Sequence, residues 1–225
     1  MPRSSSRCPP GSICRILLLP MVAGLLAAAG CAGQQAGAFW YTLGVVKPPK
    51  KAVSYELPRK PVLILVDDDR DLAQPRQICD LLVDALAQEL REQDLVDRVT
   101  TNEELAKVRQ SEPNFDKRGA REVGRLVKAD IVIWLNISRY SLPDELEWSG
   151  TPAYFGASVK IVNAQAERRD DVRLWPTTTE GKIVEVKVSP HDIRQCKTVK
   201  EAQQVMAESL AAEVARLFYE YQEES

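Results

Sequence analysis

Apolar residues recur along the chain in unbroken runs and in regular alternation, and both patterns predict strands. Five consecutive apolar residues in PVLILVD, at 61–67, predict a buried central strand. ADIVIWLNISRY, at 129–140, predicts a second long strand. Apolar and polar residues alternate in GASVKIVNA at 156–164 and GKIVEVKVS at 181–189, which is typical of antiparallel strands with one face in water. RLWP, at 173–176, predicts a short strand between these two.

Apolar residues three and four positions apart predict helices elsewhere in the chain. Thr101 and Glu104 have the spacing of a capping box, so we expect a helix to begin there. The four expected helices span 75–93, 101–109, 117–128 and 198–221, and LVDRVT at 95–100 predicts a short strand between the first two. The buried face of the last helix is expected to consist of Val199, Ala202, Met206, Leu210, Val214, Leu217, Phe218 and Tyr221.

The order of these elements predicts an α+β, or mixed α/β, fold. A β-α-β unit comes first, two further helices follow, and three or four strands precede the last helix. A single sheet of about five strands, partly antiparallel, with helices packed on it would bury these apolar stripes. We therefore expect one domain over 61–225 that ends in a long amphipathic helix.

An apolar run at 16–29 indicates secretion. It is shorter than the about 20 residues that a helix needs to cross a bilayer. Arg3, Arg7 and Arg15 precede the run and small residues end it, as in a signal peptide. We expect residues 1–30 to be that signal peptide.

Cys31 directly follows Ala28, Ala29 and Gly30, and these four residues resemble a bacterial lipobox. In that motif a peptidase cuts before the cysteine after its thiol has been lipidated, so Cys31 is the expected lipidation site. Ala28 departs from the leucine that is usual in the family. The alternative is an ordinary signal peptide in which Cys31 is incidental. Residues 31–60, rich in proline and lysine, are expected to form an extended tether after the lipid.

Composition excludes several classes of partner and site. Removing the three arginines of the signal from 30 basic residues leaves 27 against 32 acidic ones, a net charge of about −5, and the basic residues are dispersed. Nucleic acid is therefore not an expected partner. His191 is the only histidine and lies in a Pro-containing stretch that predicts a loop, so a zinc site built on several histidines is excluded. Cys79 and Cys196 either form a disulfide or are two buried thiols, and their spacing leaves both open.

An acidic cluster, Asp67, Asp68 and Asp69, follows the first strand. It resembles the metal-binding corner of a response-regulator receiver domain, where carboxylates hold Mg²⁺, and this makes the three aspartates candidate metal ligands. A receiver also needs a phosphate-accepting aspartate after a later strand, and there this chain has Asn136 and Ser138. The cluster equally fits a solvated strand-to-helix loop, and no cofactor is expected.

A second candidate site is the long connection at 141–156. It carries Trp148, Tyr154 and Phe155 among turn residues, and loops of this kind often bind partners. The same residues could instead fold over the end of the sheet, and the sequence favours neither reading.

The element order resembles one group of envelope proteins, mainly through the strand entry in GRLVKADIVIWLNISRY and the final helix that ends in ARLFYEY. Over 61–221 the chain is similar to lipoproteins of the curli-secretion and penicillin-binding-protein-activator type, and to the N-terminal domain of the propeller protein of the Tol–Pal system. The resemblance implies a non-enzymatic domain for protein binding or assembly at the cell envelope.

The function expected from the sequence is therefore that of a membrane-anchored envelope lipoprotein with an envelope protein as its partner. Ala32, rather than aspartate, would follow Cys31, which in enteric bacteria implies the outer membrane, with the domain facing the periplasm. The alternative is a secreted metal- or small-molecule-binding domain, or an enzyme, that uses the acidic loop at 67–71.

Overall fold

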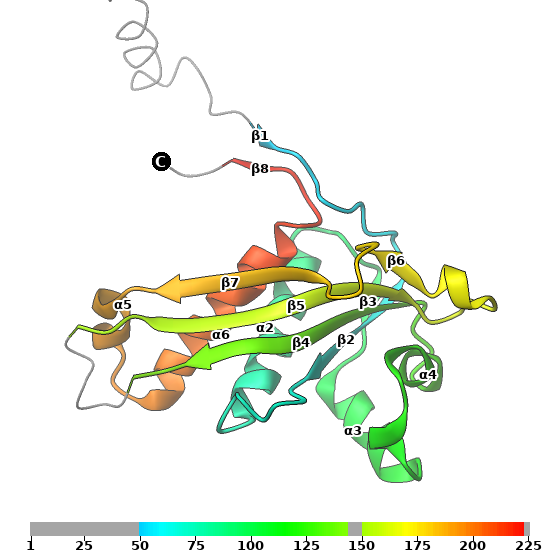
Figure 1. The fold of residues 1–225 in the computed structure, drawn as a ribbon, viewed down its shortest axis with the longest axis horizontal. Coiled ribbons are helices and arrows are strands. Elements are labelled where there is room, and N and C mark those ends of the chain that lie inside the picture. Colours follow the sequence, from blue (N-terminus) through cyan, green and yellow to red (C-terminus); the bar gives the residue numbers. More distant parts are fainter. Residues whose placement is uncertain (1–49, 144–149, 223–225) are drawn as a thin grey trace, which may run out of the picture. The chain divides into compact units, whose positions relative to one another are not determined.

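The computed structural model describes residues 50–143 and 150–222, and Lys51–Tyr221 form one compact unit (Figure 1). Its mixed sheet contains, in order, β3 (Arg98–Val99), β2 (Pro61–Asp67), β4 (Ile131–Ser141), β5 (Ala153–Asn163) and β6 (Arg173–Trp175), and β7 (Lys182–Val188) also pairs with β5. β2 runs parallel to β3 and to β4, whereas β5 runs antiparallel to β4, β6 and β7. Two-residue strands, β1 (Lys50–Lys51) and β8 (Tyr221–Gln222), stand at the ends of the described residues.

Helices cover the two faces of this sheet unequally. One face packs against α2 (Gln77–Glu92) and α6 (Val199–Ala215) over its whole width (Figure 1). Within the described residues, the other face is covered only near β2, the start of β4 and the end of β5, by α3 (Asn102–Ser111), the 3₁₀ turn η1 (Phe115–Lys117) and α4 (Ala120–Leu126). Two short elements complete the unit, α5 (Pro190–Gln195) and the 3₁₀ turn η3 (Arg169–Asp171).

The two-residue period of a strand explains why β4 can pack on both faces. Ile133 and Leu135 point toward α2 and α6, whereas Val132, which precedes Ile133, points toward α4. All three side chains are fully buried. Where α3 and α4 no longer cover the second face, its side chains become polar, as at Asn136 and Lys160. This uncovered part of the sheet is referred to below as the open face.

The α+β fold class expected from the sequence is confirmed. The central strand at 61–67 is confirmed with the same bounds, and the Thr101–Glu104 capping box is present at the start of α3, where each side chain bonds the other's backbone N–H. The last helix ends at Ala215, so the expected extension to 221 was wrong. Val199, which we expected in its buried face, is 36% exposed at the first turn.

The stretch around His191 forms the helix α5 and not the expected loop. Ser189 caps it, because its side-chain oxygen accepts the backbone N–H of Asp192 at 3.2 Å. Pro190 occupies the first helical position, where its missing N–H costs nothing. Ile193 anchors the helix in the core and is fully buried. A cap, a proline and one apolar residue thus define a helix too short for periodicity to reveal.

Candidate functional site

A cleft of about 640 Å³ opens at the carboxyl end of β2. The chain leaves β2 through α2 on one face of the sheet to reach β3. It then returns through α3, η1 and α4 on the opposite face to reach β4, on the other side of β2. Such a change of direction at the carboxyl ends of parallel strands separates the flanking connections and leaves a crevice, the usual binding position of open α/β sheets.

Charged side chains of both signs line this cleft. Asp67, Asp68 and Asp69 enter from the end of β2, and Asp80 enters from the first turn of α2. Three arginines complete the lining: Arg76 at the start of α2, Arg109 from α3 and Arg118 after η1. The sequence pointed to Asp67–Asp69, whereas Asp80 and the arginines were missed. Arg109 and Arg118 are remote from β2 in sequence, and only the fold brings them to the same crevice.

Asp67 is half-buried at the end of β2. Its Oδ2 accepts a hydrogen bond from Trp134 Nε1 at 2.7 Å, from the neighbouring strand β4. Burial raises the pKa of the Asp67 carboxyl and the charge of Asp69 raises it further, while the bond from Trp134 and the charge of Arg109 oppose them. The carboxylate is thus held by the indole and faces a cation across the cleft.

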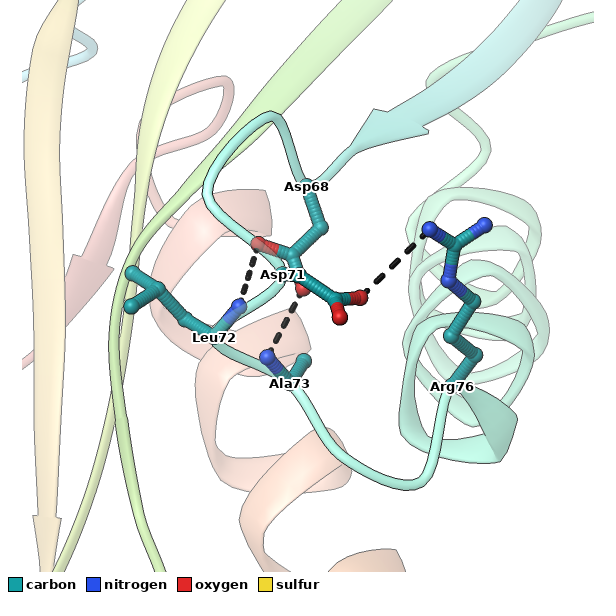
Figure 2. A network of polar contacts seen from close by, with 5 residues as sticks. All are labelled: Asp68, Asp71, Leu72, Ala73 and Arg76. Atoms are coloured by element: carbon teal, nitrogen blue, oxygen red, sulfur yellow. Dashed lines mark hydrogen bonds and ion pairs between the residues drawn. The ribbon is translucent and has the colours of Figure 1, made fainter.

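Asp68 closes the loop that follows β2 (Figure 2). Its two carboxylate oxygens accept the backbone N–H groups of Leu72 at 2.9 Å and Ala73 at 2.7 Å. The loop also contains Asp71, whose backbone has a positive φ of 53° and whose carboxylate lies 3.4 Å from Arg76. With both oxygens engaged by the backbone, Asp68 shapes the loop between β2 and α2.

The three aspartates do not converge on a common point. Asp67 is bound by Trp134, Asp68 by the loop backbone, and Asp69 accepts Asn136 Nδ2 at 2.6 Å. Within residues 50–143 and 150–222, no group of three or more histidine, cysteine, aspartate or glutamate side chains is arranged to hold a metal ion. The geometry of the loop therefore favours a structural role for the three aspartates over a role as metal ligands.

The arginines of the cleft differ in how they are held. Arg109 packs its guanidinium on the ring of Phe115, with 4.9 Å between guanidinium carbon and ring centroid. Burial raises the pKa of both Asp67 and Asp80, and the charge of Arg109 offsets part of this rise. Arg118 forms an ion pair with Glu112. Its Nε is buried and, within the described part of the chain, lacks a hydrogen-bond partner. A buried donor without a partner is costly, and no other buried side-chain nitrogen or oxygen of the described residues lacks a partner.

Cys79 lines the same cleft, and Cys196 lies at the end of α5. Both are free thiols in the described chain, so the reading without a disulfide agrees with the structure. Burial raises the pKa of the Cys79 thiol to about 11, and the charges of Asp68 and Asp80 add to the effect. Burial, followed by Glu201 and Asp192, also raises the pKa of Cys196. Neither thiol has the lowered pKa that activates a cysteine nucleophile.

His191 is exposed on α5 and is not part of the cleft lining. Its Nε2 lies 2.8 Å from Gln195 Nε2, one helical turn away. His191 is the only histidine of the chain. Because it lies outside the cleft, the aspartates there have no histidine with which to form a proton-transfer pair.

The expected partner loop is placed differently by the structure. Tyr154 and Phe155 belong to β5, which begins at Ala153 and so takes up the end of the expected loop. Phe155 is fully buried against Tyr140, with 5.7 Å between ring centroids, and its proposed place in a binding loop was wrong. Tyr154 points to the open face, where Arg139 packs on its ring. Trp148 and Cys31, the expected lipidation site, lie outside the described residues.

Comparisons with known proteins give likeness of fold only. No protein-family model and no curated protein matches the chain. The hypothetical protein CT253 from Chlamydia trachomatis has 14% identity over 71% of this chain and 96% of its own, with a TM-score of 0.42. A PelC dodecamer from Paraburkholderia phytofirmans has 11% identity over 77% and 100% (TM-score 0.38), and lipoprotein GNA1162 from Neisseria meningitidis has 12% over 71% and 99% (TM-score 0.40). These values are too low to transfer a function, and the resemblance to the curli-secretion group stays a prediction.

None of the helices in the part of the chain that the structure describes is long and apolar enough to cross a bilayer.

Proposed function

We propose that this chain is an envelope lipoprotein, anchored through Cys31, whose folded unit is a non-enzymatic protein-binding or assembly module. The observation that carries the anchor is the position of Cys31, directly after Ala28, Ala29 and Gly30 at the end of a short apolar run. A single lipid chain holds a protein at a membrane only marginally, whereas the several chains of a bacterial lipoprotein anchor hold it stably. Ala32 after the cut supports the outer membrane, with the unit facing the periplasm.

The absence of enzymatic activity is proposed from the geometry of the cleft. The carboxylates of Asp67, Asp68 and Asp69 are held by an indole, by loop backbone and by an amide, and the thiol of Cys79 has a raised pKa. A catalytic set needs a nucleophile and a base within hydrogen-bond reach of each other. The bonds of these aspartates instead support a structural role for the acidic loop. The extended sheet supports a protein-binding role for the folded unit.

The experiment is the intact mass of the protein extracted from membranes, for the wild type and for Cys31→Ser. We expect the wild type to begin at Cys31 and to carry acyl mass, and the variant to lack both features. Cys79→Ser is the matched control, because it removes a thiol from the folded unit and should leave the acyl mass unchanged. An unmodified chain cut elsewhere would make the protein soluble after secretion and would remove the anchor from the proposal.

A second candidate function, a small-molecule-binding domain, keeps one specific observation in its favour. The cleft places Arg109 and Arg118 opposite Asp67 and Asp80, and it contains the buried donor Arg118 Nε. A ligand carrying both a cation and an anion would fit such a dipolar cleft. Thermal shift with free amino acids and with Mg²⁺ tests this function. Arg121→Ala is the control, because Arg121 is not part of the cleft lining. A ligand-induced rise in melting temperature that is lost in Arg118→Ala but kept in Arg121→Ala would favour small-molecule binding over the assembly role.

A further inference from the structure

β7 is an edge strand with room beside it. It pairs with β5 along Lys182–Val188, and no other strand of the described chain pairs with its outer edge (Figure 1). Every second residue of a strand directs its N–H and C=O outward, so this edge presents a row of backbone groups that another strand can bind. A groove of about 280 Å³ runs beside Ile183, Val184 and Glu185, and it is also lined by the end of α6, by the stretch at 51–54 and by Tyr221. Ile183 is 55% exposed.

The side chains of β7 alternate between two different surroundings. Val186 and Val188 are buried on the face that packs on α6, and Val184 is half-buried there. Glu185 and Lys187 project from the open face, since they pair with Gly156 and Tyr154 of β5. The strand therefore presents valine on one face and opposite charges two residues apart on the other.

This pattern is complementary to itself in one register. Two copies of β7 that pair antiparallel about a two-fold axis at Val186 place Glu185 of each copy opposite Lys187 of the other. On the other face, Val184 of each copy meets Val188 of the other. Shifting the axis to Glu185 would place two glutamates opposite each other, which is destabilising. An axis at Val184 would pair Glu185 with Ile183, so only the axis at Val186 matches charge with charge.

We propose that a second copy of this chain is the partner of the β7 edge, bound antiparallel about Val186 so that the two sheets form one continuous sheet. The inference deepens the proposed assembly role and rests on it for the choice of a protein partner. A two-fold pairing is closed, because each edge is used up by the other and no further copy can add. The edge is then covered instead of exposed to unspecific pairing.

The test uses charge reversal at the two paired positions. Glu185→Lys alone places lysine opposite lysine, and Lys187→Glu alone places glutamate opposite glutamate, so each variant should raise the dimer dissociation constant by about tenfold or more. An equimolar mixture of the two variants restores both opposite-charge pairs and should recover the wild-type constant. Lys182→Glu is the matched control: it lies on the same strand outside the paired stretch 184–188 and should leave the constant unchanged.

Mass by light scattering, on the full chain extracted from membranes in detergent, gives the readout. A monomeric wild type at the highest soluble concentration, or a mixture that stays as weak as the single variants, overturns the inference. A response to Lys182→Glu equal to that of Lys187→Glu also overturns it, since the register is then different. Lys187→Glu keeps the test valid if Glu185→Lys unfolds, because only Glu185 pairs with Arg139. A dimer without acyl mass would remove the anchor alone, and acyl mass on a monomer would remove the dimer alone.

Discussion

Arg139 Nη1 lies 2.9 Å from Glu185 Oε1, although the two residues belong to β4 and β7 and the whole of β5 lies between them. The residue between them is Gly156, which pairs with Arg139 on one side and Glu185 on the other. Without a side chain at this position, the arginine reaches across the open face and packs its guanidinium 3.8 Å from the ring centroid of Tyr154. One glycine thus allows an ion pair to connect three strands.

Gly156→Val tests this arrangement. Valine favours strands, so at an unobstructed position it would stabilise β5. Here a Cβ would lie 3.2 Å from the backbone oxygen of Val184 and 3.3 Å from Cβ of Glu185, and the γ carbons would block the path of Arg139. We expect a loss of about 1–3 kcal/mol in the free energy of unfolding. Glu185→Gln, which removes only a partly exposed ion pair, should cost less than about 1 kcal/mol. Urea unfolding measures both, and a Gly156→Val variant as stable as the wild type would contradict the crowding.

Gly124 predicts a second steric effect, at the contact of α4 with the sheet. A Cβ there would lie 2.6 Å from Val132 Cγ2 and 2.7 Å from the Cβ of Ala164, and both of these residues are fully buried. Alanine is the better helix former by about 1 kcal/mol, yet overpacking of this kind costs about 1–3 kcal/mol. Gly124→Ala should therefore lower the free energy of unfolding. Gly119→Ala, where a Cβ meets nothing within 4 Å, is the control and should change it by less than about 1 kcal/mol.

Local sequence patterns predicted most of the fold but little of the candidate site. The runs at 61–67 and 129–140 report burial on both faces, which is why β2 and β4 could be predicted closely. The β-bulge between Ile137 and Arg139 shifts the register, so Tyr140 turns toward α6 and its hydroxyl accepts Gln203 Nε2 at 3.1 Å. The alternation of apolar and polar residues in the sequence does not predict such a register shift.

The cleft shows the same limit more strongly. Asp67 could be found because it directly follows a buried strand. Arg109 and Arg118 could not, since Arg109 lies on a mostly exposed helix and Arg118 in the connection after η1, where nothing in the local pattern marks a site. Only the path of the chain around β2 brings these arginines to the aspartates. Tyr154 and Phe155 were placed in a loop for a related reason: the aromatic residues resembled a binding loop, although Phe155 is a core residue of the extended β5.

Asp68 and Asp69 offer a test of whether the acidic loop is structural. Asp68→Ala removes the acceptor of two backbone N–H groups, those of Leu72 and Ala73, and should cost about 1–3 kcal/mol in the free energy of unfolding. Asp69→Ala removes a contact with Asn136 at an exposed position and should cost less than about 0.5 kcal/mol. Thermal unfolding of both variants measures the difference. Equal costs would contradict the role of Asp68 in closing the loop.

The two thiols should differ in reactivity. With a pKa of about 11, only about one in a thousand Cys79 side chains is a thiolate at pH 8, and the position is partly buried. Cys196 is less buried than Cys79 and lies at the end of α5, where its thiol donates to the backbone oxygen of Asp192 at 3.5 Å. We expect iodoacetamide to modify Cys196 first in the folded protein, and both cysteines after unfolding without reductant, as seen by peptide mass. A reductant-dependent modification would reveal a disulfide and contradict the free thiols.

Asp67 makes the stability of the unit depend on pH in a definite direction. Its pKa is raised in the folded chain, mainly by burial, so the folded state binds the proton more tightly than the unfolded state does. The carboxylate form therefore costs stability at neutral pH. Below the unfolded pKa of about 3.9 this cost is absent, and it grows as the pH rises through the higher folded value.

Asp67→Asn isolates this effect, because asparagine keeps an oxygen that can accept Trp134 Nε1 but carries no charge. We expect the variant to be more stable than the wild type at pH 7, with the difference shrinking as the pH falls and vanishing below the unfolded pKa. Melting temperatures of the two proteins between pH 3 and pH 7 provide the measurement. A variant that is less stable than the wild type at pH 7 would mean that the attraction between the Asp67 carboxylate and Arg109 outweighs the cost of burying that carboxylate. This result would contradict the destabilisation inferred from the raised pKa of Asp67.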